Sequence, residues 1–205
     1  MKIIQIITLF PDLFEGFINT SIIKNAIHKD KIKIKLINLR DFAINKHKQV
    51  DDYQYGGGKG MVLMAPVVVS AIRYAKSKVT NSKVILLTPQ GELFKQDRAN
   101  NLADIKDNLI LICGHYEGFD ERIRHYVDLE ISIGDYVLTS GEIASMIVAD
   151  SIIRLIPEVI QLESHQNDSF MNGYLDYPIY TKPLDFEGLK VPDILLTGHH
   201  KNINL

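Results

Sequence analysis

The stretch 109-LILICGHYEGFDER-122 decides how the rest of this chain is interpreted. An apolar run from Leu109 to Cys113 stops at Gly114, and a dense group of acids, aromatic rings and an arginine follows at once. In open α/β sheets, ligands bind beyond the carboxyl ends of the strands, where loops can turn toward them. We therefore expect a ligand site in the residues that follow Cys113.

Other apolar runs resemble this one and alternate with helical patterns. They are typical of strands buried on both faces, which occur in parallel sheets. The expected strands are Lys2–Leu9, Val84–Leu87, Leu109–Cys113 and Leu129–Ser132. The expected helices are Ser21–His28, Pro66–Lys78, Gln96–Leu102 and Glu142–Ile156, the last ended by Pro157. The pattern predicts an α/β fold with a mostly parallel sheet and helices on both faces.

Composition is that of a globular protein without tails. The 205 residues are 46% hydrophobic and 23% charged, enough for one domain or one and a fraction. The one cysteine, Cys113, favours a reducing compartment and a role as a small buried hydrophobe. The N-terminal apolar run is too short for a signal peptide, and no run reaches membrane-spanning length. We expect a soluble, cytoplasmic protein with no membrane partner.

Basic residues are concentrated near the N-terminus, although the net charge is only -2. From Lys24 to Lys48 there are eight Lys or Arg residues and two acids. Such a segment can attract phosphates. Lys31, Lys33 and Lys35 also alternate with apolar residues at period two, which is typical of a solvated strand face. We favour the strand, and the phosphate-binding alternative stays open.

The commonest nucleotide-binding loops are excluded by local sequence. Gly58-Lys59 has the pair found in a phosphate-binding P-loop, but Tyr53 stands where that loop needs its first glycine. Gly60 stands where it needs Ser or Thr. No Gly-x-Gly-x-x-Gly follows a predicted strand, so a dinucleotide fingerprint is missing as well.

Three loops at the ends of predicted strands share a Gly- or Pro-rich character. They are Thr88–Gly91, Gly114–Gly118 and Ile133–Leu138. Main-chain amides and carbonyls can approach a ligand closely in such loops, which suits a cofactor held by backbone hydrogen bonds. The alternative is that all three are tight turns without a ligand.

Seven motifs carry a resemblance to a known family. They occur in order as VDDYQYGGGKGMV (50–62), LLTPQGELF (86–94), ILICGHYEGFDERI (110–123), ISIGDYVLTSGE (131–142), RLIPEV (154–159), NDSF (167–170) and KPLDFEGLKVPDILLTGHH (182–200). Together they resemble the bacterial tRNA (guanosine-37-N1)-methyltransferases of the TrmD type, over essentially the whole chain.

This resemblance implies a fold, a reaction and partners. The expected fold gains a C-terminal trefoil knot, a feature that general topology rules would not predict. The expected reaction moves a methyl group from S-adenosylmethionine to N1 of the guanosine 3′ of the tRNA anticodon, in a homodimer with shared active sites. The implied division is a knotted cofactor-binding domain at 1–160, a linker at 161–176, and the beginning of a tRNA-binding domain at 177–205.

The resemblance also assigns roles to individual residues. Asp168 is the implied general base, although its local sequence indicates a turn or cap. Arg154 is the implied donor to the guanine, from the opposite subunit, although its spacing from Asp150 also suits a helical ion pair. The implied cofactor-binding residues are Pro89, Gly114, Ile133, Gly134, Asp135, Tyr136, Val137, Leu138 and Gly141.

Two further acids are assigned less directly. Glu117 matches an acidic position proposed to help bind Mg²⁺, although one carboxylate is far from a cage and a hydrogen bond to the knot or to the cofactor amine is an alternative. Glu142 is expected to begin a helix, where the dipole favours a carboxylate in a capping role.

Departures from the family pattern leave other functions open. Gln54, Ser140 and Ala144 stand where the family usually has proline, glycine and proline. Ser140 would crowd the cofactor loop if its backbone needs a positive φ. The chain also ends at Leu205, where relatives continue, so one alternative is a truncated cofactor-binding dimer with little turnover. Another is a metal-dependent hydrolase that uses Glu117, Asp120 and Glu121.

Overall fold

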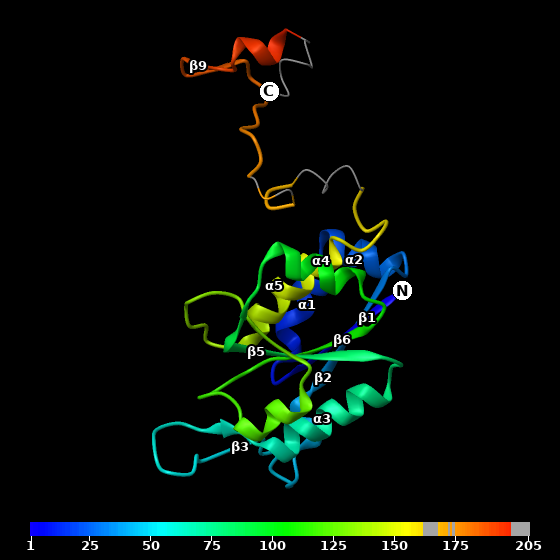
Figure 1. The fold of residues 1–205 in the computed structure, drawn as a ribbon, viewed down its shortest axis with the longest axis vertical. Coiled ribbons are helices and arrows are strands. Elements are labelled where there is room, and N and C mark those ends of the chain that lie inside the picture. Colours follow the sequence, from blue (N-terminus) through cyan, green and yellow to red (C-terminus); the bar gives the residue numbers. More distant parts are fainter. Residues whose placement is uncertain (162–167, 172, 174, 198–205) are drawn as a thin grey trace. The chain divides into compact units, whose positions relative to one another are not determined.

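A computed structural model describes residues 1–161, 168–171, 173 and 175–197 of the chain (Figure 1). The contacts within the chain divide it into two compact units, Met1–Gln166 and Asn167–Leu205. The first unit holds a sheet with helices packed against it, and the elements described in the second unit are short. Within the described residues, no helix combines the length and apolar character needed to cross a membrane.

The centre of the first unit is a five-stranded parallel sheet. Its strands are β1 (Lys2–Thr8), β2 (Ile32–Asn38), β5 (Ser82–Leu93), β6 (Asn108–Ile112) and β7 (Leu129–Ser132). Their order is β2-β1-β6-β5-β7, and every neighbouring pair is parallel. The predicted α/β fold with a mostly parallel sheet is confirmed. The lysine-rich strand β2 is an edge strand, as the solvated-strand interpretation requires.

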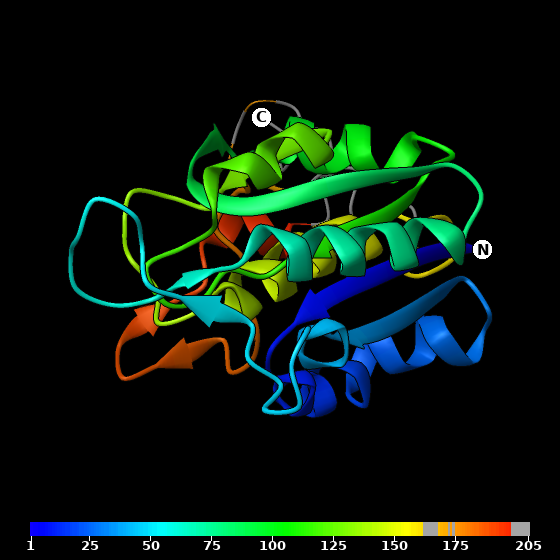
Figure 2. The ribbon, with the colours of Figure 1, turned by 90° about the horizontal axis from the view of Figure 1, so that it is seen from below.

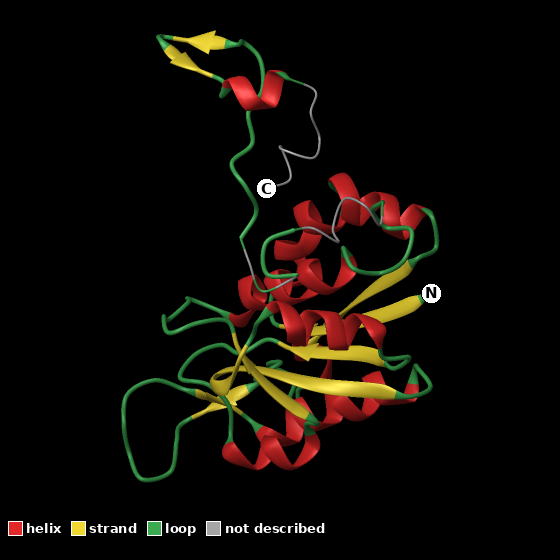
Figure 3. Cartoon of the chain, turned by 45° about the horizontal axis from the view of Figure 1, so that its top comes forward, coloured by secondary structure: helices red, strands yellow, loops and turns green. Residues whose placement is uncertain are grey.

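Helices cover both faces of this sheet (Figure 3). The first unit contains α1 (Glu15–Ile18), α2 (Ser21–His28), α3 (Ala65–Ser77), α4 (Gln96–Asp104) and α5 (Gly141–Ile153). Short 3₁₀ turns lie at Pro11–Phe14, Leu39–Phe42 and Glu121–Tyr126, and a small ribbon pairs β3 (Asp51–Asp52) with β4 (Val62–Leu63). Helix α3 lies along the strands on one face (Figure 2), and α2, α4 and α5 pack against the other.

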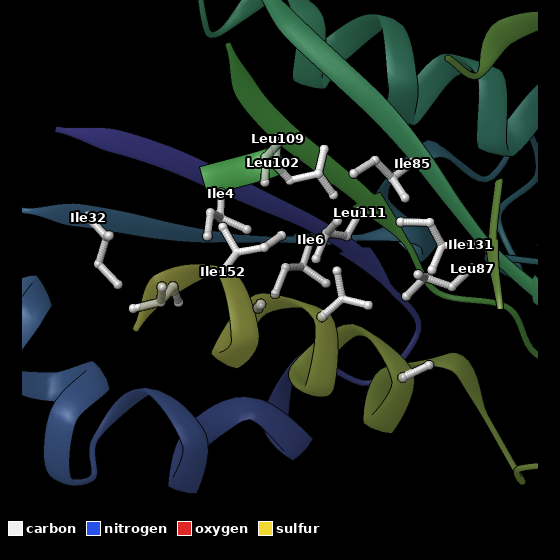
Figure 4. Packing of buried hydrophobic residues seen from close by; sticks show 14 of the residues in the cluster. Ile4, Ile6, Ile32, Ile85, Leu87, Leu102, Leu109, Leu111, Ile131 and Ile152 are labelled. Carbon is white, nitrogen blue, oxygen red and sulfur yellow. The ribbon is translucent and has the colours of Figure 1, made fainter. Parts of the chain in front are cut away.

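Each face of the sheet has its own apolar core. Ile4, Ile6 and Leu111 point toward α5, where Ile152 meets them (Figure 4). Ile7, Ile110 and other alternate residues of the same strands pack toward α3 on the opposite face. Strands buried on both sides read as continuous apolar runs, which explains why sequence identified them.

Two element boundaries differ from the prediction by three residues or more. The strand expected to stop at Leu87 continues to Leu93, because Glu92 and Leu93 pair with β7 after a register shift. The helix expected to reach Ile156 ends at Ile153. Beyond this end, the Leu155 and Ile156 N–H groups donate to carbonyls three residues back in the sequence, and not four as in an α-helix.

Backbone segments cross closely at the carboxyl edge of the sheet. The Gly141 N–H donates to the Gly114 carbonyl at 2.7 Å, and a Cβ on Gly141 would lie 2.4 Å from the Gly114 nitrogen. A Cβ on Gly91 would likewise lie 2.4 Å from the Ile131 nitrogen. Only glycine fits at such crossings. The trefoil knot stays a prediction from the resemblance.

The described residues of the second unit include a short hairpin and a 3₁₀ turn. Strands β8 (Asp185–Phe186) and β9 (Leu189–Lys190) pair antiparallel, and the turn spans Asp193–Leu196. The predicted boundary between domain and linker at residue 160 stays a prediction, while chain contacts divide the units after Gln166.

Candidate active site

A pocket of about 380 Å³ lies at the carboxyl edge of the sheet in the first unit. Its walls come from the middle of β5, from the segment after β6, and from the end of β7 with the residues after it, together with Arg124 and Ala144. The segments are residues 86–90, 114–121 and 131–134 with 136–141. The volume falls within the range of about 300–1,000 Å³ that is usual for small-molecule sites. Parallel strands thus bring together the three loops that the sequence indicated.

Glycines keep the walls of this pocket open. Gly134 has φ +147, and a Cβ there would lie 2.4 Å from the Tyr136 ring. A Cβ on Gly114 would lie 2.9 Å from the Phe119 ring. A side chain at either position would displace the neighbouring aromatic ring. Glycine avoids this clash and lets a ligand approach the main chain closely.

The pocket gathers most of the residues to which the resemblance assigns cofactor binding. Those lining it are Pro89, Gly114, Ile133, Gly134, Tyr136, Val137, Leu138 and Gly141, whereas Asp135 of that set is not among the lining residues. Ser140, at φ -163, is extended and carries no strain, so the concern about a positive φ there was wrong. Ala144 forms part of the wall.

The loop after β6 is held by an unusual backbone and by ring contacts. Tyr116 adopts φ +59, in the left-handed region that side chains disfavour. The His115 ring packs edge-on against Tyr116 at 4.5 Å and against Phe10 at 5.0 Å between ring centroids. His115 Nδ1 is buried without a hydrogen-bond partner in the structure. Strained backbone and unsatisfied polar atoms both concentrate at functional sites.

The acids of the opening stretch are largely engaged with arginines. Arg122 donates to both carboxylate oxygens of Asp120, at 2.9 and 2.5 Å, and this bonding lowers the pKa of Asp120. Arg124 pairs with Glu121 at 3.1 Å. Glu117 lines the pocket but is exposed. Across the part of the chain that the structure describes, no group of three or more His, Cys, Asp or Glu could hold a metal ion.

Glu142 does not play the capping role expected from its position. It stands in the first turn of α5 but is only 1% exposed, and its Oε1 accepts a 2.6 Å hydrogen bond from the Thr8 hydroxyl. Burial first, and then the charge of Glu142, raise the pKa of the neighbouring Cys113 thiol. Cys113 is buried, as predicted. Sequence could not find the pairing because Thr8 lies 134 residues away.

Of the two implied catalytic residues, Arg154 belongs to the first unit and is not among the residues that line the pocket. Arg154 is the C-cap of α5, and its N–H donates to the Asp150 carbonyl at 3.1 Å. Gly141, which lines the pocket, begins the same helix. Thirteen residues at 1.5 Å each separate the two ends of α5 by about 20 Å. Asp168 belongs to the second unit, where its carbonyl accepts the Met171 N–H.

Fold and pocket define an α/β protein that holds a small ligand through main-chain loops at the carboxyl edge of a parallel sheet. The family model described as tRNA (guanine-1)-methyltransferase TrmD matches residues 1–205. The chain belongs to this family.

Relatives cover nearly the whole chain. A tRNA (guanine-N(1)-)-methyltransferase of Spiroplasma kunkelii is 55% identical over 203 residues, which are 99% of this chain and 75% of the relative. One from Bacillus cereus is 50% identical over 204 residues, 98% of this chain and 83% of that protein. The crystal structure of tRNA (m1G37) methyltransferase from Aquifex aeolicus matches with a TM-score of 0.83 and 37% identity, covering 99% of this chain and 86% of that one.

Proposed function

We propose that this protein methylates N1 of guanosine-37 in tRNA, with S-adenosylmethionine as the methyl donor. The observation that carries the proposal is the pocket at the carboxyl edge of the sheet. It combines eight residues to which the resemblance assigns cofactor binding with glycine positions that no side chain could occupy. Membership of the methyltransferase family supports the same reaction. Because tRNA acts at the ribosome, the proposed place of action is the cytoplasm.

The pocket walls fit an adenosine cofactor. Apolar side chains such as Ile133 and Leu138 form a slot for a planar base. Near Gly114 and Gly134 the main chain comes to the pocket wall, where amides and carbonyls can meet the edges of the base. When bound, S-adenosylmethionine supplies a methyl group that is activated by a positive sulfur. The walls orient this group toward the acceptor, and such positioning can contribute about 7 kcal/mol or more to lowering a bimolecular barrier.

Asp168 and Arg154 complete the proposed reaction. The Asp168 carboxylate accepts the guanine N1 proton as the ring nitrogen is methylated, a role that contributes roughly two to four orders of magnitude in other enzymes. Negative charge develops on O6 of the guanine as the N1 proton leaves, and it is neutralised as the methyl group is transferred. The permanently charged Arg154 guanidinium donates hydrogen bonds to that oxygen.

The reaction needs a second copy of the chain. Arg154 stands about 15 Å along α5 from Ala144, the pocket residue nearest to it on that helix, farther than its own side chain can reach. Helix α5 also exposes an unpartnered apolar stripe, with Ile143 47% and Ile147 41% exposed. Exposed apolar patches mark protein interfaces. We propose a homodimer in which α5 lies at the interface and carries Arg154 to the partner's pocket.

The described residues do not form a site for magnesium. Glu117 offers a single exposed carboxylate, and no metal-holding group of acids occurs among the described residues. Mg²⁺ prefers several oxygen ligands with near-octahedral geometry. No step of the proposed reaction is therefore assigned to a metal bound at Glu117.

The test is a methylation assay with the purified chain. Labelled S-adenosylmethionine is incubated with tRNA transcripts that carry either guanosine or adenosine at position 37, with and without Mg²⁺. The expected product is 1-methylguanosine from the first transcript alone. No product under any of these conditions, while the protein is folded and binds the cofactor, would contradict the proposed activity.

A further inference from the structure

Glu142 is a buried carboxylate that has no evident use within the fold. It is 1% exposed, and only one of its oxygens, Oε1, has a hydrogen-bond partner, the Thr8 hydroxyl at 2.6 Å. Oε2 is buried without any partner in the structure. A buried polar atom left unsatisfied costs stability, and the cost is larger when the group is charged. Such an atom therefore requires an explanation.

Packing alone does not account for this carboxylate. Thr8 Oγ1 already accepts the Phe10 N–H at 2.9 Å, so its hydroxyl hydrogen goes to Glu142. A glutamine at position 142 could accept the same bond through its amide oxygen. The negative charge is thus not needed for the one contact that the side chain makes, although the positive end of the α5 dipole makes the charge tolerable there.

Residues on either side of Glu142 in α5 line the cofactor pocket. Gly141, the residue before Glu142, lines the pocket, and so does Ala144, two residues after it. The Gly141 N–H is bonded to the Gly114 carbonyl, which fixes the start of α5 against the loop after β6. A carboxylate held there, away from water, acts on a bound charge with little screening.

Other charged groups around the pocket are less suited to such an effect. Glu121 is exposed and paired with Arg124, and Glu130 also pairs with Arg124 at 3.4 Å. The Glu117 carboxylate is exposed. Water and salt screen charges at exposed positions strongly. Glu142 is not itself among the lining residues, but it is buried next to two of them, whereas the acids that line the pocket, Glu117, Asp120 and Glu121, are at least partly exposed.

We propose that Glu142 is a specificity residue whose buried carboxylate favours the positively charged sulfonium of the methyl donor over the neutral thioether of the spent product. This inference rests on the proposed function, because it assumes that S-adenosylmethionine binds this pocket. This preference would help S-adenosylmethionine to replace the spent product in the pocket. After methyl transfer, the ligand has lost its charge and with it the attraction of Glu142, so the product leaves more readily.

The experiment compares two ligands that differ by this charge. Calorimetry measures the Kd of S-adenosylmethionine and of S-adenosylhomocysteine for the unmodified protein and for Glu142→Gln. We expect the variant to bind S-adenosylmethionine about tenfold more weakly and S-adenosylhomocysteine within about twofold of the original value. Its thermal unfolding midpoint should stay equal or rise, because an unpaired buried charge has been removed.

Two control variants separate charge from shape. Thr8→Val removes the hydrogen bond but keeps the charge, so its unfolding midpoint should fall while its ratio of the two Kd values stays that of the original protein. Glu158→Gln removes one exposed negative charge, paired with Lys31, and should leave both affinities unchanged. These variants also show whether the ratio responds to changes elsewhere in the unit.

Several outcomes would overturn the inference. Equal weakening of both ligands in Glu142→Gln would make Glu142 a structural support for the pocket, and an unchanged ratio would remove any role for its charge. A shift of the ratio in Thr8→Val as large as that in Glu142→Gln would also contradict it. If the unmodified protein bound neither ligand, the proposed function would fail and this inference with it.

Discussion

The two ends of helix α5 differ in what surrounds them, and the difference shows how the activity is divided. At the first end, Gly141 and Glu142 are fixed by bonds to Gly114 and Thr8 beside the cofactor pocket. At the other end, Arg154 caps the helix about 20 Å away. The pocket forms a cofactor cradle that is lined by residues of one copy of the chain, and in the proposed dimer a second copy brings Arg154 to it. The cradle should therefore bind its ligand even where turnover is lost.

The largest expected effect separates these two functions. Asp168→Ala should lower turnover by roughly two to four orders of magnitude, because no other group is assigned to take the N1 proton. The Kd for S-adenosylmethionine should change little, since the cradle is built from the first unit alone. Single-turnover methylation and calorimetry measure the two quantities. Asp176→Ala, in the same unit, is the matched control, and an equal loss of binding and turnover would show that Asp168 instead holds its loop.

The next effect should appear in the cradle itself. Gly141→Ala places a methyl group 2.4 Å from the Gly114 nitrogen, so backbone must move at the crossing. We expect a loss of about 1–3 kcal/mol in the free energy of unfolding and a matching loss of cofactor affinity, measured by urea unfolding and calorimetry. Gly16→Ala is the control, because a Cβ there has nothing within 4 Å. A stable Gly141→Ala protein with normal affinity would mean that the crossing is not tightly packed.

A smaller effect on stability should accompany loss of the dimer. Changing both Ile143 and Ile147 to aspartate puts charges on the exposed stripe of α5 without touching the core. Sedimentation should show a monomer that remains folded, and methylation should disappear. The control Ile44→Asp changes an isoleucine that is 73% exposed elsewhere in the unit and should leave the assembly intact. A double variant that is still dimeric would place the interface on another surface.

The smallest expected effect is on thermal stability and comes from the ion pair between Asp120 and Arg122. Arg122 lowers the pKa of Asp120 in the folded protein, so the pair stabilises the fold above the ordinary pKa of aspartate and ceases to do so as pH falls through the lowered value. Arg122→Gln should therefore lower Tm near pH 6 by about 2 °C or less, because the pair is largely exposed. The difference should shrink as pH falls through the lowered pKa of Asp120. A difference that grew in acid would contradict this assignment.

Local patterns predicted most of the scaffold but not its irregular parts. Helix Ser21–His28 and strand Leu129–Ser132 have the predicted bounds because their apolar spacing and neighbouring turns leave little choice. Strand β5 was predicted too short because Pro89 and Gly91 usually interrupt a strand, whereas pairing with β7 resumes beyond them. Tertiary pairing of this kind is invisible to a local pattern.

Local sequence patterns predicted the candidate site only in part, for the same reason. Glycine-rich loops after apolar strands identified the pocket, since parallel strands must deliver their carboxyl ends to one edge. The partnership of Glu142 with Thr8 depends on a fold that joins residues 134 positions apart. Asp168 and Arg154 have ordinary local surroundings for a turn and a helix end, so only the family resemblance indicates their roles.

The division of labour between subunits is tested most directly by mixing two inactive dimers. Arg154→Ala and Asp168→Ala proteins are purified separately, unfolded together and refolded, and methylation is measured. If each site takes Arg154 from one subunit and Asp168 from the other, a mixed dimer has one intact site, and random mixing should restore about a quarter of the original activity. If both residues came from the same subunit, no mixed dimer would hold an intact site and the mixture would stay inactive, which would contradict the shared site.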